Sequence, residues 1–421
     1  MKFRRRLRRI ALLGQLGPGL VTGAADDDPS GIATYSQAGA QFGFGLLWTM
    51  LLTYPLMSAV QLISAHIGRV TGKGLASNMR AVLPHWLVTA LVALLFLANT
   101  INIGADLAAM GAAGEMVSGV DSHILTVVLA LLSLTLQLFV PYRRYATLLK
   151  WLTLALLAYV AVLLFVKLDW GQVVRGLVVP RIAGAGAVVT IVALFGTTIS
   201  PYLFFWQSAQ EVEDLDGDPR AEPLKDAPWQ ARREFRRMNV DTWAGMAFSN
   251  LVALAIMIAT AATLHATGHD QINTAADAAR ALQPVAGQFA FLLFAIGIVG
   301  TGFLAVPVLA GSAAFAVAES RGWDSGLEYK PHEAVGFYAV IGAATVLGIA
   351  IDWSPLDPIK ALFWSAVVNG VIAVPIMAAM MLVAARNVTM GKFTASRWLL
   401  RGGWAATLVM GVASVAMLVT M

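Results

Sequence analysis

The sequence predicts an all-helical polytopic membrane protein with eleven transmembrane helices, of which the first and the sixth are broken near their middle. Three observations predict this class. Hydrophobic residues make up 58% of the 421 residues and charged residues only 13%, against roughly 25% charged in soluble domains. Lys and Arg gather between the apolar stretches or at their ends rather than in their middle. Two of the apolar stretches contain a proline-centred interruption, which a continuous helix does not tolerate without a break or kink.

The composition also excludes several classes of function. The chain has no cysteine, so it can form neither a disulfide nor a thiolate metal site. It has no P-loop or nucleotide-binding fingerprint, which argues against an ATP-driven pump. We see no nucleophile paired with a base, so we expect no enzyme and no cofactor. The net charge of +5 comes from residues at span ends and does not indicate a nucleic-acid partner. We expect a monomer whose partner is the lipid bilayer.

Apolar runs of about 20 residues, the length that crosses a bilayer as a helix, define the spans. The spans cover about 11–38, 44–69, 84–111, 122–141, 145–168, 186–210, 239–264, 284–318, 333–351, 357–385 and 400–420. The N-terminal run MKFRRRLRRI precedes the first span without a small-residue cleavage site. We therefore interpret it as a cytoplasmic anchor rather than a signal peptide.

Charge asymmetry between the connections predicts the orientation. If the N-terminus is cytoplasmic, 24 of the 29 Lys and Arg residues fall on the cytoplasmic side and 5 fall outside. An excess of basic residues in short loops marks the cytoplasmic side of membrane proteins. We therefore expect a bacterial-type cytoplasmic (inner) membrane protein, with the N-terminus inside and, because the span count is odd, the C-terminus outside.

The first break lies in the sequence Asp26-Asp27-Asp28-Pro29-Ser30-Gly31. Carboxylates within a span are rare and normally mark an ion or substrate path. Pro29 removes a backbone donor and Gly31 frees the backbone, so the helix should end here and expose carbonyl oxygens beside a carboxylate. Such hard oxygen donors suit hard cations. Successive helical residues lie about 100° apart, so the three carboxylates cannot share one face. A turn in a soluble loop is the alternative, which the membrane composition disfavours.

The second break lies in the sixth span, in Gly196-Thr197-Thr198-Ile199-Ser200-Pro201. Alone it could be a simple proline kink. Its position five spans after the first break favours two inverted repeats in a single domain over 1–421. Spans 1–5 (about 11–168) form one repeat, spans 6–10 (about 186–385) form the other, and span 11 (about 400–420) is extra. Interrupted helices at matching positions of two halves are typical of a secondary-transporter binding site.

Four further polar residues within spans are candidates for the ion path or for coupling. They are Asn102 and Asp106 in the third span, Asn250 in the seventh and Asn369 in the tenth. A carboxylate in mid-span, such as Asp106, favours a functional role over a buried hydrogen-bonded partner. Each asparagine could line the path or act as a hydrogen-bonding contact between helices.

At the two breaks the sequence resembles the NRAMP family of divalent-metal transporters. The motifs that carry the resemblance are GPGL, DPSGIATYSQAGAQFGFGLLW, GRVTGKGLA, ADLAAMG and TISP. The resemblance implies a LeuT-type fold of five plus five inverted helices. It also implies a metal site at Asp28, Gly31, Thr197 and Ser200, with Pro29, Ser30 and Pro201 forming the helix breaks.

The chain departs from the family pattern at several of these positions. The family has Asp-Pro-Gly-Asn in the first span and Ala-x-x-Met-Pro-His in the sixth, so the Asn becomes Gly31, the Met becomes Ser200 and the His becomes Tyr202. A thioether favours softer metals, whereas carboxylate, carbonyl and water suit Mg²⁺ and Mn²⁺. A glutamate that often follows the third-span Asp is Ala109 here. The pattern is similar to the NRAMP-related magnesium transporters.

The resulting hypothesis is uptake of Mg²⁺ in preference, with Mn²⁺ also carried as substrate, by alternating access and without proton coupling. The loss of the family's His and Glu motivates the uncoupled mechanism, because a Tyr hydroxyl at 202 does not titrate readily near neutrality. Two alternatives stay open. One is a proton-coupled Mn²⁺/Fe²⁺ transporter of the NRAMP type, and the other is a sodium-coupled organic solute symporter. A channel-like protein without a carrier cycle is a third and less favoured alternative.

Overall fold

The computed structural model describes residues 17–140, 153–182, 184–353 and 357–420. Every regular element in these ranges is a helix, which confirms the predicted all-helical class. Nine helical segments of the described chain are long and apolar enough to cross a membrane. The total of eleven spans stays a prediction, because the starts of the first and fifth spans and the basic N-terminal cluster lie outside the described residues.

The described helices follow the predicted spans closely. They are α2 (Pro18–Asp26), α3 (Pro29–Phe42), α4 (Trp48–Thr71), α5 (Leu75–Arg80), α6 (His85–Ser118), α7 (Ser122–Phe139), α9 (Leu157–Phe165), α10 (Trp170–Val178), α11 (Gly184–Thr198), α12 (Pro201–Asp216), α13 (Ala231–Thr263), α14 (Ala275–Ala279), α15 (Gln283–Ala286), α16 (Ala290–Arg321), α17 (Val335–Asp352), α18 (Pro358–Ala384), α19 (Asn387–Met390) and α20 (Arg397–Thr420). The largest differences are at α13, which begins eight residues before the expected 239, and at α6, which ends seven residues after the expected 111.

Both predicted helix breaks are confirmed. Helix α2 ends at Asp26 and α3 begins at Pro29, while α11 ends at Thr198 and α12 begins at Pro201. Each proline takes the first position of the second half-helix, where its missing N–H is not needed and its fixed φ fits the helix. The local chemistry of the two Pro residues therefore explains where each half-helix starts.

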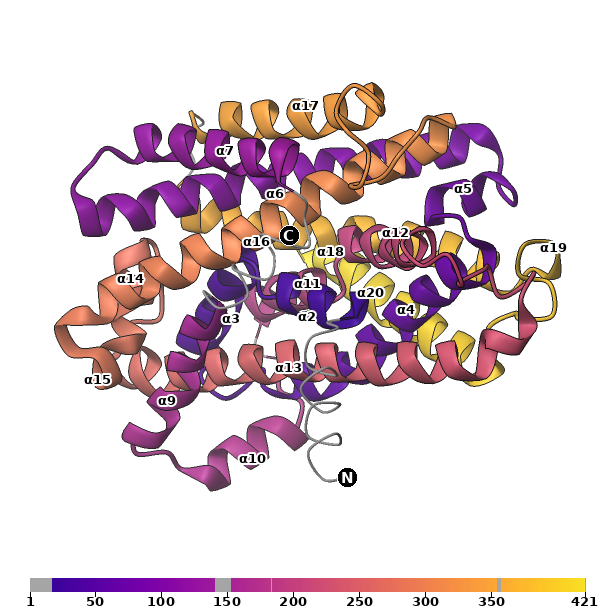
Figure 1. Cartoon of the computed structure of the whole chain (residues 1–421). Helices are drawn as coiled ribbons and strands as arrows, with labels where there is room; N and C mark the ends of the chain where they lie inside the picture. The colour runs from indigo at the N-terminus through magenta and orange to yellow at the C-terminus, as the bar shows by residue number, and fades with distance from the viewer. Residues whose placement is uncertain (1–16, 141–152, 183, 354–356, 421) are drawn as a thin grey trace, which may run out of the picture.

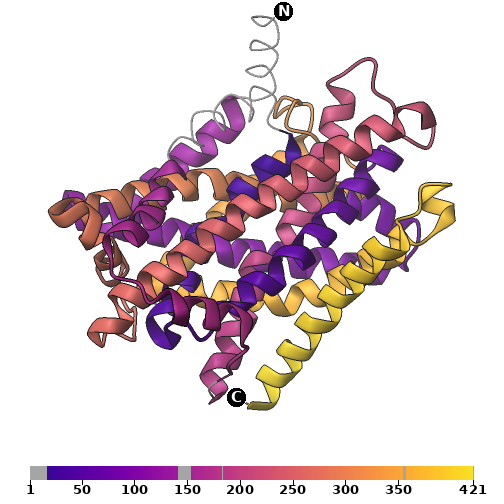
Figure 2. The same ribbon diagram turned by 90° about the horizontal axis from the view of Figure 1, so that it is seen from below.

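The broken helices lie in the middle of the bundle. Figure 1 shows α2, α3 and α11 near the centre, with α6 and α16 above them and α13 below. Helix α13 packs on both α2 and α3, α18 packs on α11, α3 and α6, and α16 packs along α6. Seen from below, α13 runs across the face of the molecule and α20 lies along its side (Figure 2). The two breaks are thus enclosed by long apolar helices.

Glycines allow the broken helices to approach their neighbours closely. A Cβ atom on Gly23 of α2 would lie 2.3 Å from the carbonyl oxygen of Gly245 on α13. A Cβ atom on Gly196 of α11 would lie 2.0 Å from the carbonyl oxygen of Ala366 on α18. Both distances are far below van der Waals contact, so only glycine fits at these two positions.

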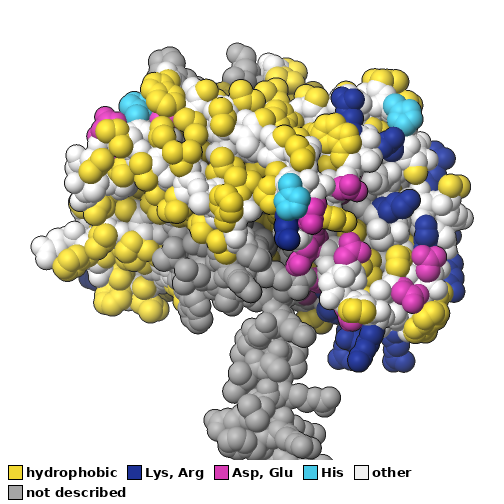
Figure 3. All heavy atoms as spheres, turned by 45° about the horizontal axis from the view of Figure 1, so that its top comes forward, with side chains coloured by type: hydrophobic (Ala, Val, Ile, Leu, Met, Phe, Trp, Pro, Cys, Tyr) yellow, Lys and Arg dark blue, Asp and Glu magenta, His cyan; other side chains and the backbone are white. Residues whose placement is uncertain are grey.

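Two contacts join segments that the predicted topology places on the same side of the membrane. At one end the Leu224 amide donates to the Arg69 carbonyl over 3.2 Å, which joins two segments predicted to be cytoplasmic. At the other end His123 and Asp352 join two segments predicted to lie outside, with 2.7 Å between Nδ1 and Oδ2. Charged side chains gather at the right-hand end of the face in Figure 3, and hydrophobic side chains cover most of the rest. The direction in which these ends face in a cell stays a prediction.

An ion-pair network ties three helices together at the predicted cytoplasmic end. Arg69 of α4 lies 3.2 Å from Glu234 of α13, and Arg237 of α13 lies 3.0 Å from the same carboxylate. Arg237 also pairs with Glu211 of α12, whose side chain is fully buried. The second half of the broken sixth span is therefore fastened to α13 by charge.

Candidate functional site

Asp28 is held at the first break by two hydrogen bonds. As the N-cap of α3, its Oδ1 accepts from the Gly31 amide at 2.6 Å, which is the usual role of Asp at a helix start. Its Oδ2 accepts from the Asn102 side-chain amide of α6 at 3.0 Å. The side chain is only 2% exposed, yet no Lys, Arg or His within the described residues pairs with it. Asp28 is therefore an oriented buried carboxylate without a protein cation.

Ser365 of α18 fixes the orientation of Asn102. The Ser365 hydroxyl donates to Asn102 Oδ1 at 2.6 Å, so the amide nitrogen of Asn102 faces Asp28. The Ser30 hydroxyl of α3 lies 3.3 Å from the Ser365 hydroxyl, so Ser365 contacts both Asn102 and the helix that Asp28 caps. Ser365 was not among the candidate residues from the sequence. A signal was present, because Ser365 precedes Asn369 by four residues and shares its helix face.

Hydroxyl groups from the second break satisfy the carbonyls that both prolines leave free. Because Pro29 has no N–H, the carbonyl of Ala25 lacks its helical donor, and the Tyr202 hydroxyl donates to it at 3.0 Å. Because Pro201 has no N–H, the carbonyl of Thr197 lacks its helical donor, and the Ser200 hydroxyl lies 2.9 Å from it and shares its single proton between this carbonyl and that of Gly196. Ser200 also lies 2.6 Å from the Gly196 carbonyl.

The two breaks meet at Gly31. A Cβ atom built on Gly31 would lie 3.1 Å from Thr197 Oγ1, 3.2 Å from Tyr35 Cε2 and 3.3 Å from Asp28 Oδ1. Three of the four expected metal positions, Asp28, Gly31 and Thr197, are therefore neighbours. In this structure Thr197 and Tyr35 lie next to the position that the family's Asn side chain would occupy.

Asp26 and Asp27 contact Ser249 of α13 rather than the groups that hold Asp28. The Ser249 hydroxyl makes a short hydrogen bond to Asp26 Oδ2 and lies 3.1 Å from Asp27 Oδ1. A hydroxyl has a single proton, so it can donate fully to only one of these carboxyl groups. The expectation that the three carboxylates do not share a face is thus met. Ser249 was not a candidate from the sequence, although it precedes the candidate Asn250.

The remaining sequence candidates lie around this centre. Asp106 is fully buried on α6, one helical turn from Asn102 and on the same face. Asn369 is buried on α18 and Asn250 is half-buried on α13, and neither side-chain oxygen has a hydrogen-bond partner in the described part of the chain. Neither asparagine hydrogen-bonds to Asp28.

The charges at the centre are unbalanced. The carboxylates of Asp26, Asp27, Asp28 and Asp106 are each at most 2% exposed, and across the described ranges no basic side chain forms an ion pair with any of them. Burying an unpaired charge is costly, so the site requires protons or bound cations. No group of three or more His, Cys, Asp or Glu side chains among the described residues is close enough to hold a metal ion. A cation at Asp28 would therefore take its other ligands from hydroxyls, backbone carbonyls and water.

Comparisons with known proteins agree on one family. The sequence profile of the family described as natural resistance-associated macrophage protein-like matches residues 19–420. The divalent metal cation transporter MntH of Klebsiella pneumoniae (strain 342) is 30% identical over 314 residues, which cover 70% of this chain and 70% of the relative.

Solved structures share the fold. A manganese transporter from Eremococcus coleocola matches with a TM-score of 0.73 and 19% identity, over 96% of this chain and 85% of that chain. The closed conformation of Mhp1, a nucleobase-cation-symport-1 family transporter, matches with a TM-score of 0.55 and 12% identity, over 96% of this chain and 92% of that chain. At these identities the likeness concerns the fold alone, which is the LeuT-like arrangement expected from the sequence.

Proposed function

The chain belongs to the natural resistance-associated macrophage protein-like (NRAMP) family, and from this premise we propose that it is a divalent metal cation transporter that takes up Mg²⁺ in preference and also carries Mn²⁺. It is a transporter rather than an enzyme. The single observation that carries the proposal is Asp28, a buried carboxylate that two donated hydrogen bonds orient and no basic side chain of the described residues neutralises.

Support for a hard cation comes from the donor set around Asp28. Asn102 contacts Asp28, Ser365 contacts Asn102, and Thr197 Oγ1 lies by Gly31; the atoms of these three side chains that can serve as ligands are all oxygens. Neither sulfur nor imidazole nitrogen belongs to this set. Carboxylate, carbonyl and water ligands suit Mg²⁺ and Mn²⁺ better than softer transition metals. Because Mg²⁺ gives up water reluctantly, we propose that it binds at Asp28 with part of its hydration shell.

The two carbonyls at the breaks can contribute without losing their present partners. The Ala25 carbonyl oxygen accepts one hydroxyl hydrogen bond, the Thr197 carbonyl oxygen shares the Ser200 proton with the Gly196 carbonyl, and each keeps a lone pair for another partner. We propose that Thr197 offers that lone pair, directly or through water, and that the hydroxyl oxygen of Ser200 stands where the family has its thioether. Binding of a hydrated ion requires Thr197 and Tyr35 to move away from Gly31, which alternating access around the break would provide.

The membrane potential suffices to drive uptake. Two positive charges that cross 100 mV towards the negative side gain roughly 4.6 kcal/mol. We propose that transport is not coupled to protons. In support of this, the position of the family's sixth-span histidine is Tyr202, whose hydroxyl is engaged by the Ala25 carbonyl.

A second candidate is proton-coupled Mn²⁺ transport. The observation that favours it is the set of buried carboxylates beyond Asp28, namely Asp26, Asp27 and Asp106, which must be neutralised in some way. Sodium-coupled transport of an organic solute has only the shared fold in its favour.

Flux into proteoliposomes tests these alternatives. The vesicles contain a Mg²⁺-sensitive dye and a pH indicator, and Mg²⁺, Mn²⁺ or Ca²⁺ is added outside at a fixed membrane potential. Saturable Mg²⁺ entry that Mn²⁺ inhibits, without internal acidification, is the expected result. Mn²⁺ entry with acidification and no Mg²⁺ flux would establish the second candidate instead.

A further inference from the structure

A patch of five exposed basic side chains lies at the predicted cytoplasmic end, on two helices that are far apart in the sequence and on the segment that precedes the second of them. It consists of Arg232 and Arg236 on α13, Lys392 after α19, and Arg397 and Arg401 on α20. We call these five residues the basic patch. Both arginine pairs have i, i+4 spacing, so each pair occupies one helix face.

Aromatic packing places the two halves of the basic patch at the same level. Phe235, between the two arginines of α13, contacts Phe393 with 5.7 Å between ring centroids. It also contacts His66 of α4 at 4.6 Å, and His66 lies 2.8 Å from the Phe393 carbonyl. Phe235 and Leu399 belong to one apolar cluster with Leu62 of α4. The patch is therefore supported by packed side chains beneath it.

The basic patch has no acidic partners. The sequence contains no Asp or Glu after Asp357, so the segment with Lys392, Arg397 and Arg401 is wholly basic. On α13, Glu234 is buried and already engaged by Arg69 and Arg237. In the described residues none of the five patch side chains forms an ion pair. The exposed positive charge of the patch is therefore free to attract an anion from outside the chain.

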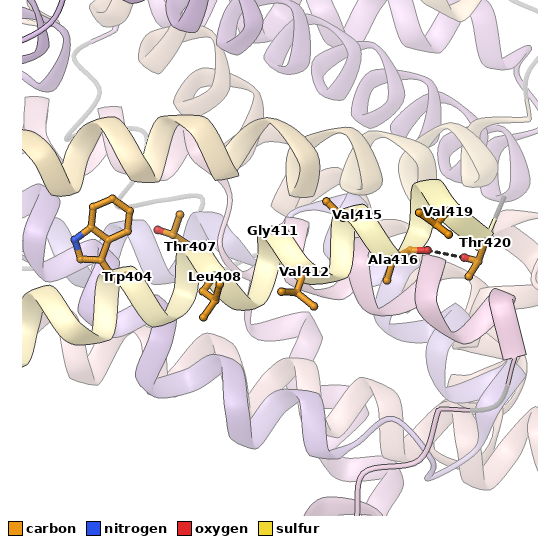
Figure 4. A pocket seen from close by; sticks show the side chains of 9 residues that line it. All are labelled: Trp404, Thr407, Leu408, Gly411, Val412, Val415, Ala416, Val419 and Thr420. Carbon is orange, nitrogen blue, oxygen red and sulfur yellow. Dashed lines mark hydrogen bonds between the residues drawn. The ribbon is translucent and has the colours of Figure 1, made fainter.

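The apolar surface next to the patch indicates where it lies relative to the bilayer. Trp398 is 79% exposed, and the guanidinium of Arg401 lies 4.8 Å from the centre of its ring. Farther along α20 the lining of a shallow groove is almost wholly apolar, from Trp404 through Leu408 and Val412 (Figure 4). Exposed Trp residues between basic and apolar surface are typical of the level of lipid headgroups.

From this arrangement we propose that the basic patch binds the headgroup of an anionic phospholipid. Arg397 and Arg401 would hold the phosphate through their planar guanidinium groups, which match its oxygens. Arg232, Arg236 and Lys392 would add charge attraction, and the acyl chains would lie along the apolar face of α20. The occupant is a lipid rather than a soluble anion, because the charges border on lipid-facing surface. This inference does not depend on the identity of the transported ion.

Lipid titration of the delipidated full-length protein in detergent tests the proposal. Thermal unfolding is followed while phosphatidylglycerol or phosphatidylcholine with the same acyl chains is added, and native mass spectrometry counts bound lipid. We expect phosphatidylglycerol to raise the melting temperature and phosphatidylcholine to have little effect.

In R397Q/R401Q the apparent affinity for phosphatidylglycerol should fall roughly 10- to 30-fold, and R397K/R401K should keep most of it. The control is K360Q, which removes an exposed Lys at the opposite end of the molecule and should change nothing.

Three outcomes would overturn the proposal. They are equal stabilisation by the two lipids, an unchanged affinity in R397Q/R401Q, and full stabilisation by glycerol 1-phosphate alone, which would identify a soluble-anion site. The variant R232Q/R236Q provides an independent check if R397Q/R401Q does not fold, since it should also weaken binding of phosphatidylglycerol several-fold.

Discussion

The hydroxyl of Tyr202 donates a hydrogen bond of 3.0 Å to the carbonyl oxygen of Ala25, and so the second helix break supplies the donor that Pro29 removes from the first. The two residues lie 177 positions apart in the chain, on half-helices of the two different breaks. The hydrogen bond therefore contributes to stability and joins the two breaks in this conformation.

Replacing Tyr202 with Phe should leave the Ala25 carbonyl buried without a donor. Loss of one partner of a buried hydrogen bond costs about 1–3 kcal/mol, so the melting temperature should fall and transport should weaken. Thermal unfolding in detergent and Mg²⁺ flux measure the two effects. Tyr54→Phe is the matched control, since it removes only an exposed hydrogen bond of 3.3 Å to the Trp243 carbonyl. Equal effects of the two variants would contradict the role assigned to Tyr202.

Asp28→Asn separates the charge of Asp28 from its function as a helix cap. Asn is also a good N-cap, so the bond from the Gly31 amide can persist and the fold should be retained. Loss of a buried charged ligand should reduce Mg²⁺ flux by roughly 100-fold or more, beyond the effect of typical outer-shell substitutions. Asp169→Asn is the matched control, because Asp169 caps the exposed helix α10 in the same manner. Full flux in Asp28→Asn would exclude Asp28 as the ion site.

Ser365→Ala should affect the affinity for the ion more than the maximal rate. Without the Ser365 hydroxyl, the Asn102 amide can rotate, and the hydrogen bond that orients Asp28 is weakened. We expect the apparent KM for Mg²⁺ to rise roughly 10-fold, the size of effect seen for groups that orient metal ligands. Ser414→Ala, a buried Ser on α20, should leave the KM unchanged. A change in maximal rate alone would indicate that Ser365 acts through folding or motion instead.

Gly196→Ala should destabilise the protein strongly. Its Cβ would lie 2.0 Å from the Ala366 carbonyl oxygen and 2.4 Å from the Gly370 nitrogen, and both are backbone atoms that cannot rotate away. Overpacking of this kind costs about 1–3 kcal/mol or more. Gly342→Ala offers the opposite case, because nothing lies within 4 Å of its Cβ, and Ala within a helix should add about 0.5–1 kcal/mol. Equal melting temperatures for the two variants would show that the close contact of α11 with α18 is not required.

Glu211→Gln should loosen the attachment of α12 to α13. Glu211 is fully buried and pairs with Arg237, whose side chain is 31% exposed and keeps Glu234 as a second partner. Breaking a buried pair costs about 3–5 kcal/mol, and the remaining partner and partial exposure should reduce the loss to about 1–3 kcal/mol. Thermal unfolding measures it, with Glu333→Gln at an exposed position as the control. If Glu211→Gln leaves the melting temperature unchanged, the ion pairs with Arg237 do not stabilise the packing of α12 on α13.

The sequence by itself determined the helical class and the positions of both breaks. These features follow from local chemistry, because apolar length defines a span and Pro29 and Pro201 remove backbone donors. Only the tertiary structure decided which groups meet. Tyr202 at the Ala25 carbonyl, Ser365 at Asn102, and Ser249 between Asp26 and Asp27 join residues more than 170 positions apart, and no local pattern fixes such pairs. Asp28 is oriented by one hydrogen bond from Gly31, three residues away in the chain, and by one from Asn102 on another helix. The sequence therefore predicted Asp28 as a site residue but not the contacts that surround it.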